Sequence, residues 1–284
     1  MSVVPMKAIV DRALEGRYGV PAMNIFNDLT LSAVLSAASE LRSPIIVQTS
    51  VKTVKWYGAP VLHAMFAAMA RDLPVPVSLH LDHCPDRAFI SLCLQAGWNS
   101  VLFDAHELSV EENKRQTIEV VAEAKRYGAN VEGEIEAIEG VEDDVGSDDA
   151  SHEQPFEVAV DFIRSTKIDI FAPSIGNKHG EYKTPPKLNA DRVTELFKAA
   201  PIPMALHGGT GLSQAQFDDL ISRGCAKINI STALKVRYLD ANREFLQSHP
   251  TNYDPPSLFR YVFDACKQLA SDQIRSFHSD GKAA

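Results

Sequence analysis

The sequence predicts an α/β protein, a closed (β/α)₈ TIM barrel with extra helices at its C-terminus. Eight short runs of β-branched and apolar residues alternate with longer segments of helical periodicity, which is typical of parallel strands joined by helices. Eight such units are the number that closes a barrel. With 284 residues, the chain has room for a barrel of about 250 residues and a short extension. We therefore expect a single domain over residues 1–284, with residues 250–284 as a C-terminal helical extension.

Each predicted strand is a short run such as PIIVQT, SVLFDA or KINIS. Strands of a parallel sheet are buried on both faces, so they form near-continuous apolar runs of this kind. The predicted strands cover residues 20–26, 44–49, 75–82, 100–105, 130–136, 168–174, 203–207 and 226–231.

The segments between these runs repeat apolar residues every three or four positions, as amphipathic helices do. The predicted helices cover residues 32–41, 60–70, 87–96, 110–127, 189–199, 213–223 and 234–247. After a Pro255-Pro256 break the tail resumes the same period. We expect one or two extra helices there, packed on the barrel or on a partner subunit.

One segment departs from the alternation. Residues 141–154, VEDDVGSDDASHEQ, carry six carboxylates, no Lys or Arg, and no apolar period. Long irregular segments within a compact domain are often functional loops. We expect a mobile acidic loop here, with a plain solvated connector as the alternative.

Composition excludes several classes of protein. The net charge of −9 argues against nonspecific nucleic-acid binding, which needs a basic surface. The four cysteines are widely spaced and form no C-x-x-C pair, which favours reduced thiols in a cytoplasmic protein. The chain has no apolar stretch of about 18 residues and no export signal, so we expect no membrane association.

Polar residues gather at the predicted strand ends, where barrel enzymes have their active sites. These residues are Asp82, His83, Asp104, Glu134, His179, His207 and Asn229. A single histidine at such a place is more often structural, but three from separate strands, with one open position, form the ligand set of a catalytic zinc site. His80 lies deeper on the strand face of Asp82, so we expect a buried supporting role for it.

Two loops after the last strands favour an anion. The seventh strand is followed by HGGTGLS and the eighth ends in NIST, the two positions where barrels commonly bind phosphate. Glycines allow close backbone approach, and exposed N–H groups at a helix start attract an anion. We expect a phosphate site that includes Asn229, Ser231 and Thr232, with Lys183 as an added positive charge.

These motifs together carry a family resemblance. LHLDHC, VEGEIE followed by GVEDD, GNKHGEYK, LHGGTG and KINIST resemble the class II, metal-dependent ketose-bisphosphate aldolases, which include fructose-bisphosphate and tagatose-bisphosphate aldolases. The resemblance spans nearly the whole chain in the family's order, including AMN near the start and YDP in the tail. It implies reversible cleavage of a ketose 1-phosphate or 1,6-bisphosphate to dihydroxyacetone phosphate and an aldehyde, through an enediolate stabilised by Zn²⁺. It also implies a homodimer or homotetramer.

The resemblance further implies roles for single residues. Asp82 would be the general acid/base at the C4 hydroxyl, and Glu142 would exchange the proton at the enediolate carbon. The zinc ligands would be His83, His179 and His207, with Asp104 and Glu134 able to hold a metal in a displaced or second position. The substrate, and a possible Na⁺ or K⁺ near its phosphate, would lie among Asn24, Ser50, Gly180, Lys183, Gly208, Gly209, Thr210, Gly211, Asn229, Ser231 and Thr232.

The chain departs from the family pattern at His106, Glu136, Glu139, Ser231 and Pro256. Pro256 stands where relatives have an arginine that reaches a neighbouring subunit's site and holds the distal phosphate. A charge-assisted hydrogen bond contributes about 1.5–3 kcal/mol, so its loss should weaken a 6-phosphate substrate about tenfold to a few hundredfold. We expect an aldehyde half without a phosphate, or a phosphate held by Arg260 or Lys52.

Two other functions are the alternatives. A metal-assisted hydrolase on a barrel would usually have an H-x-H pair on an early strand, where this chain has AMN. A non-catalytic barrel subunit of the same family would not need Asp82, Glu142 and all three histidines. No lysine is singled out by spacing as a buried nucleophile for Schiff-base chemistry.

Overall fold

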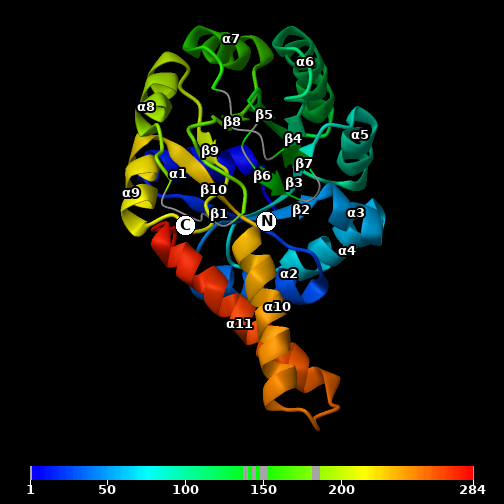
Figure 1. The fold of residues 1–284 in the computed structure, drawn as a ribbon. Coiled ribbons are helices and arrows are strands. Elements are labelled where there is room, and N and C mark those ends of the chain that lie inside the picture. The colour runs from blue at the N-terminus through cyan, green and yellow to red at the C-terminus, as the bar shows by residue number, and fades with distance from the viewer. Residues whose placement is uncertain are drawn as a thin grey trace.

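In the computed structural model, eight parallel strands close into a barrel surrounded by helices (Figure 1). The structure describes residues 2–136, 138, 140–142, 145–147, 153–180 and 186–283, and only the backbone of 140–142 and 145–147. Neighbouring strands around the barrel follow the order β1-β10-β9-β8-β5-β4-β3-β2. The barrel strands are β1 (Val20–Asn24), β2 (Ile45–Ser50), β3 (Val77–Cys84), β4 (Ser100–Asp104), β5 (Asn130–Glu134), β8 (Ile170–Phe171), β9 (Met204–Leu206) and β10 (Cys225–Ile230). The predicted fold class is confirmed, and each predicted strand is present.

The helices cover the outside of the barrel. Every predicted helix is found, and three further helices, α1, α3 and α7, were not among the predicted ones. The helices are α1 (Met6–Gly16), α2 (Asp28–Glu40), α3 (Val51–Tyr57), α4 (Ala59–Ala70), α5 (Arg87–Ala96), α6 (Val110–Arg126), α7 (Phe156–Thr166), α8 (Ala190–Ala199), α9 (Gln214–Arg223), α10 (Thr232–Ser248) and α11 (Pro255–Ser276).

The barrel interior changes from apolar to polar along its axis. At the N-terminal end of the strands, α1 buries Met6, Ile9 and Val10 against small and branched residues such as Ala22 and Ile46. Two residues further along three of the strands, on the same inward face, the side chains are polar and buried: Asn24, Gln48 and His207. The site is therefore built on strands whose other end is closed by a packed apolar cluster.

The tail forms one long helix rather than two. Asp254 begins α11 by accepting a hydrogen bond from the backbone N–H of Ser257, and Pro255 occupies the first turn, where its missing N–H costs nothing. The helix packs on α2 and α10, and α10 and α11 project together beyond the barrel (Figure 1). No helix in the described part of the chain has the length and apolarity needed to cross a bilayer.

The acidic segment is not wholly irregular. Two short strands, β6 (Gly140–Glu142) and β7 (Val145–Ser147), pair antiparallel within it. The expected acidic loop therefore contains a short hairpin, in which backbone groups that would otherwise need solvent bond to one another, and its mobility stays a prediction. Residues 143, 144 and 148–152 lie outside the described residues.

Candidate active site

The site lies where neighbouring parallel strands end together. Asp82 on β3 is in register with Ser50 on β2, and Asp104 on β4 is in register with Glu134 on β5. His83 adopts a φ of +37°, which is uncommon for a residue other than glycine. The backbone therefore turns at His83, beside Asp82, at the C-terminal end of the barrel.

Three histidine rings meet at this end. The ring centroid of His83 lies 4.7 Å from that of His207 and 5.0 Å from that of His179, and the last two are 6.0 Å apart. One ring nitrogen from each lies within 4.8 Å of the others. All three side chains are buried. The structure thus brings together the three histidines predicted as metal ligands.

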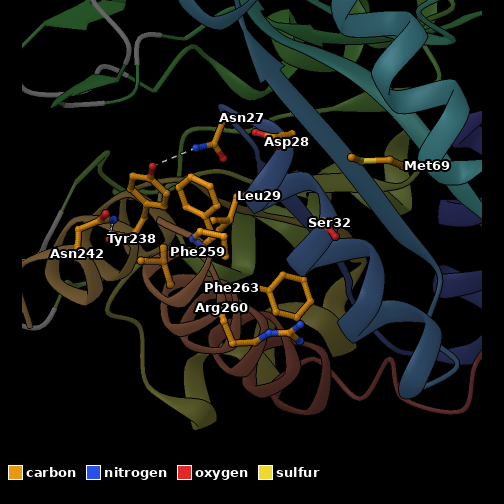
Figure 2. A pocket seen from close by; sticks show the side chains of 12 residues that line it. Asn27, Asp28, Leu29, Ser32, Met69, Tyr238, Asn242, Phe259, Arg260 and Phe263 are labelled. Atoms are coloured by element: carbon orange, nitrogen blue, oxygen red, sulfur yellow. Dashed lines mark hydrogen bonds between the residues drawn. The ribbon is translucent and has the colours of Figure 1, made fainter. Parts of the chain in front are cut away.

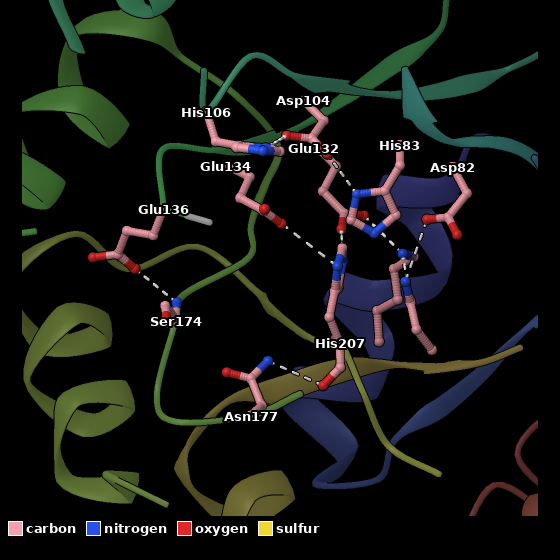
Figure 3. A network of polar contacts seen from close by, with 12 residues as sticks. Asp82, His83, Asp104, His106, Glu132, Glu134, Glu136, Ser174, Asn177 and His207 are labelled. Atoms are coloured by element: carbon pink, nitrogen blue, oxygen red, sulfur yellow. Dashed lines mark hydrogen bonds and ion pairs between the residues drawn. The ribbon is translucent and has the colours of Figure 1, made fainter. Parts of the chain in front are cut away.

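Carboxylates orient two of these rings (Figure 3). His83 Nδ1 lies 2.7 Å from Asp104 Oδ2, and His207 Nε2 lies 2.7 Å from Glu132 Oε1. The opposite atoms, His83 Nε2 and His207 Nδ1, are buried without a hydrogen-bond partner in the described part of the chain. Buried polar atoms normally have partners, and a carboxylate on the far side of a histidine is the usual support of a metal ligand. The residues present therefore fit a zinc ion.

A second group, His83, Asp104 and Glu134, also places one donor atom from each within 4.8 Å. Burial opposes charge on His83, but Asp82 and Asp104 raise its pKa well above the ordinary value. Burial would raise the pKa of Asp104, but its contacts with His106 and His83 lower it instead. Burial and the charge of Asp104 raise the pKa of Glu134 well above its ordinary value. Because zinc ligation requires a neutral imidazole, metal binding here would release a proton.

Asp82 is held by two side-chain amides. Its Oδ2 accepts a hydrogen bond from Asn24 Nδ2 at 2.7 Å, and its Oδ1 accepts one from Asn229 Nδ2 at 3.3 Å. Gln48 Nε2 in turn donates to Asn24 Oδ1 at 2.7 Å. These contacts fix the carboxylate beside His83 with its oxygens able to accept a proton.

The glycine-rich loop follows β9, and α10 begins directly after β10. Gly208 has a φ of +64°, and a Cβ there would lie 2.2 Å from the backbone oxygen of Lys178, so only glycine fits. Thr210 Oγ1 accepts a hydrogen bond from the backbone N–H of Ala233 at 3.4 Å, which joins this loop to the first turn of α10. Ser231 Oγ, just before that turn, is buried without a hydrogen-bond partner among the described residues. The predicted phosphate positions on these two loops are therefore neighbours.

The structure describes one predicted site residue only in part and another not at all. Glu142 belongs to β6, but its side chain is outside the described part. Lys183 lies outside the described residues. Their roles stay predictions.

A pocket of about 360 Å³ adjoins the Asp82 side of the site. Asn24 and Ser50 line it together with two lysines, Lys52 and Lys235, and Tyr238. The pocket lies next to the predicted substrate-binding residues, and a longer substrate could extend into it.

A separate pocket of about 550 Å³ lies between α2, α10 and α11 (Figure 2). Pro256 and Arg260 line it, and Tyr238, which also faces the smaller pocket, accepts a hydrogen bond from Asn27 across it at 3.1 Å. Of the two bases predicted to replace the distal arginine, Lys52 therefore lines the pocket beside Asn24, whereas Arg260 lines this other one.

A family model described as "Fructose-bisphosphate aldolase class-II" matches residues 4–282. The chain belongs to this family. It is 36% identical over 287 residues to a fructose-bisphosphate aldolase of Geobacillus stearothermophilus, with all of both chains covered. It is 34% identical over 284 residues to a sulfofructosephosphate aldolase of Alkalicoccus urumqiensis, covering 100% of this chain and 99% of that one.

Solved structures of aldolases share the fold of this chain. The YdjI aldolase of Escherichia coli K12 superposes with a TM-score of 0.87 at 31% identity, covering 99% of this chain and 100% of that one. A putative fructose-1,6-biphosphate aldolase of Coccidioides immitis gives a TM-score of 0.90 at 29% identity, covering 97% and 96%. The protein is thus a class II aldolase, a lyase of a family that is generally zinc-dependent and acts on sugar phosphates.

Three polar residues near this site were not among the predicted site residues of this aldolase. His106 Nδ1 lies 2.5 Å from Asp104 Oδ1. Glu132 and Lys227 are fully buried inside the barrel. The chain therefore has a buried lysine that its spacing in the sequence did not single out. The alternation of side chains along a strand could have identified Glu132 and Lys227. Glu132 precedes Glu134 by two residues and Lys227 precedes Asn229 by two, which places each pair on one strand face.

A buried ion pair was missed as well. Arg192 on α8 contacts Glu136 Oε1 and donates to the backbone oxygen of Gln154 at 2.9 Å. Glu136 also accepts hydrogen bonds from the backbone N–H groups of Gln154 and Ser174. This cluster ties together the two described ends of the segment that contains β6 and β7.

Proposed function

We propose that this aldolase reversibly cleaves a ketose 1-phosphate to dihydroxyacetone phosphate and an aldehyde. The observation that carries the proposal is the buried cluster of His83, His179 and His207 next to an oriented carboxylate, Asp82. A zinc ion held by these three histidines would act as a Lewis acid toward negative charge that develops on substrate oxygens. The remaining chemistry is done by the side chains around it.

Asp82 would take the proton of the C4 hydroxyl during cleavage and return it during condensation. Its two amide contacts, from Asn24 and Asn229, hold the carboxylate in place. Glu142 would exchange the proton at the carbon that the cleavage leaves behind. This division follows the family resemblance, and the burial and orientation of Asp82 support it.

The C1 phosphate would bind between the glycine-rich loop and the start of α10. Backbone N–H groups at a helix start favour an anion, and Ser231 Oγ supplies a buried hydroxyl there. Lys183 and a Na⁺ or K⁺ would add positive charge. The phosphate residues would be Gly180, Gly208, Gly209, Thr210, Gly211, Ser231 and Thr232.

The aldehyde half of the substrate would extend into the pocket lined by Ser50 and Lys52. Pro256 replaces the arginine that the resemblance places in the tail, so a distal phosphate would lack that partner. We expect kcat/KM for fructose 1-phosphate to lie within about tenfold of that for fructose 1,6-bisphosphate, because the contact that would favour the bisphosphate by about tenfold to a few hundredfold is missing. The measurement is steady-state release of dihydroxyacetone phosphate from each sugar.

A preference above about a hundredfold for the bisphosphate would contradict this prediction. It would require a contact to the distal phosphate as strong as the arginine contact that the chain lacks. In that case Lys52→Ala would show whether this lysine replaces the arginine. Arg260→Ala is the matched control, because Arg260 lines the other pocket.

We also propose a homodimer or homotetramer that uses the projecting α10 and α11. Large side chains are exposed there, including Tyr253 at 90%, Leu246 at 57% and Phe259 at 55%. Burial of such apolar surface is the usual driving force for association.

The proposed activity is tested by incubating the zinc-loaded protein with a panel of ketose 1-phosphates and 1,6-bisphosphates. We expect dihydroxyacetone phosphate to be released from at least one of them. Release of inorganic phosphate instead would indicate a hydrolase, and no product from any sugar phosphate would indicate a non-catalytic member of the family.

A further inference from the structure

Lys227 lies inside the barrel, fully buried, on β10. Removing a lysine ammonium from water is costly unless the charge is paired and hydrogen-bonded. Lys227 Nζ lies 2.9 Å from Glu132 Oε2 and donates a hydrogen bond to Asn229 Oδ1 at 2.7 Å. The ammonium therefore joins two side chains that lead in different directions.

One direction leads to the histidine cluster. Glu132 Oε1 lies 2.7 Å from His207 Nε2. Because a carboxylate only accepts, this contact places the ring hydrogen on Nε2 and leaves a lone pair on Nδ1, which lies 3.5 Å from Glu134 Oε2. Lys227 holds the opposite oxygen of the same carboxylate, so it fixes how Glu132 meets the ring.

The other direction leads to Asp82. An ammonium only donates, so its partner on Asn229 must be the amide oxygen. The amide nitrogen of Asn229 then faces Asp82 Oδ1 at 3.3 Å. Asp82 accepts from the nitrogen end of this amide and Lys227 donates to its oxygen end, so the two contacts together fix its orientation, and loss of Lys227 removes the donor at the oxygen end.

We propose that Lys227 is a positioning residue that orients a metal ligand through Glu132 and the proton-transferring carboxylate through Asn229 at the same time. The inference rests on the proposed roles of His207 and Asp82 and adds a residue that touches neither substrate nor metal. It also explains why this lysine is buried without assigning it a role as a nucleophile, since its ammonium is already held by two partners.

The test compares Lys227→Met with the double variant Lys227→Met/Glu132→Gln. Methionine keeps the length of the side chain without the charge. Two quantities are measured: zinc affinity, by competition with a chelator of known affinity, and kcat and KM for aldol cleavage. Lys198→Met is the control, because Lys198 is an exposed lysine on α8.

For Lys227→Met we expect zinc affinity to fall about 10- to 100-fold, as for loss of a residue that supports a ligand. We expect kcat to fall by a similar factor of about 10 to 100 with KM nearly unchanged. In the double variant the neutral amide oxygen of Gln can accept from His207 without a counter-charge, so zinc affinity should exceed that of Lys227→Met but stay below that of the wild type, which keeps the carboxylate. Its kcat should stay low because the oxygen end of Asn229 still lacks its donor.

Wild-type zinc affinity and kcat in a folded Lys227→Met protein would overturn the proposal. Should that variant fail to fold, the double variant decides: recovery of both zinc affinity and kcat would show that Lys227 only neutralises Glu132. The zinc measurement does not depend on catalysis, so it separates failure of this inference from failure of the proposed activity.

Discussion

Asp82→Ala is expected to lower kcat for aldol cleavage by about 10²- to 10⁴-fold, the usual contribution of a positioned general acid or base. The carboxylate is buried beside His83 and held by Asn24 and Asn229, and alanine has no group that can take or return the proton. Zinc content and the melting temperature should change little. The measurement is steady-state release of dihydroxyacetone phosphate, with zinc determined on the same samples.

Asp72→Ala is the matched control, because Asp72 is an exposed aspartate beyond the end of α4. We also expect Asp82→Asn to be nearly as slow as the alanine variant, since an amide cannot take the proton. Activity within about threefold of the wild type in Asp82→Ala would exclude it as the general acid/base, because such a loss is far below the usual contribution.

His207→Ala is expected to abolish tight zinc binding and, with it, aldol cleavage. Loss of a residue that only supports a ligand costs about 10- to 100-fold in metal affinity, and loss of a ligand should cost more. His207 is fully buried, and one of its ring nitrogens belongs to the cluster formed with His83 and His179. The measurement is zinc per chain after dialysis against a weak chelator.

His278→Ala serves as the control here. Its Nε2 pairs with Asp218 at 2.8 Å on the surface, where the side chain is 55% exposed. A His207→Ala protein that kept one zinc per chain and normal turnover would show that the metal, if present, binds elsewhere.

The fold could be predicted because a parallel barrel leaves a strong local pattern. Strands buried on both faces are apolar runs, and β2 and β4 were read correctly from IIVQT and SVLFD. The helix α3 was missed because it starts directly after β2, with Ser50 as its N-cap, so no loop marks the boundary. The helix α1 did carry a readable pattern, with Met6, Ile9, Val10 and Ala13 at helical spacing and all buried.

The site could be predicted only where it lies at strand ends. Asp82 and His83 end β3, and this position distinguishes them from His80, whose Nδ1 contacts Ser100 Oγ at 2.8 Å inside the barrel. As expected, His80 is a buried supporting residue. Burial, followed by the charge of Lys227, lowers its pKa to about 3, so it stays neutral.

The buried ion pairs could not be predicted in the same way. Glu132 and Lys227 are 95 positions apart in the sequence and meet only because the barrel closes. Likewise Glu136 meets Arg192 only because the fold brings α8 to the segment that follows β5. Alternation indicates that such residues point inward, but it does not indicate which of them will be partners.

We expect this aldolase to work through a metal held by three histidines and to form no covalent bond to a lysine. The most direct measurement treats the wild-type protein with borohydride in the presence of dihydroxyacetone phosphate, and a second sample with a chelator, and follows aldol cleavage in both. We expect activity to persist after borohydride, to disappear with the chelator and to return with Zn²⁺. Activity in metal-free protein, or a reduced adduct on Lys227, would contradict it.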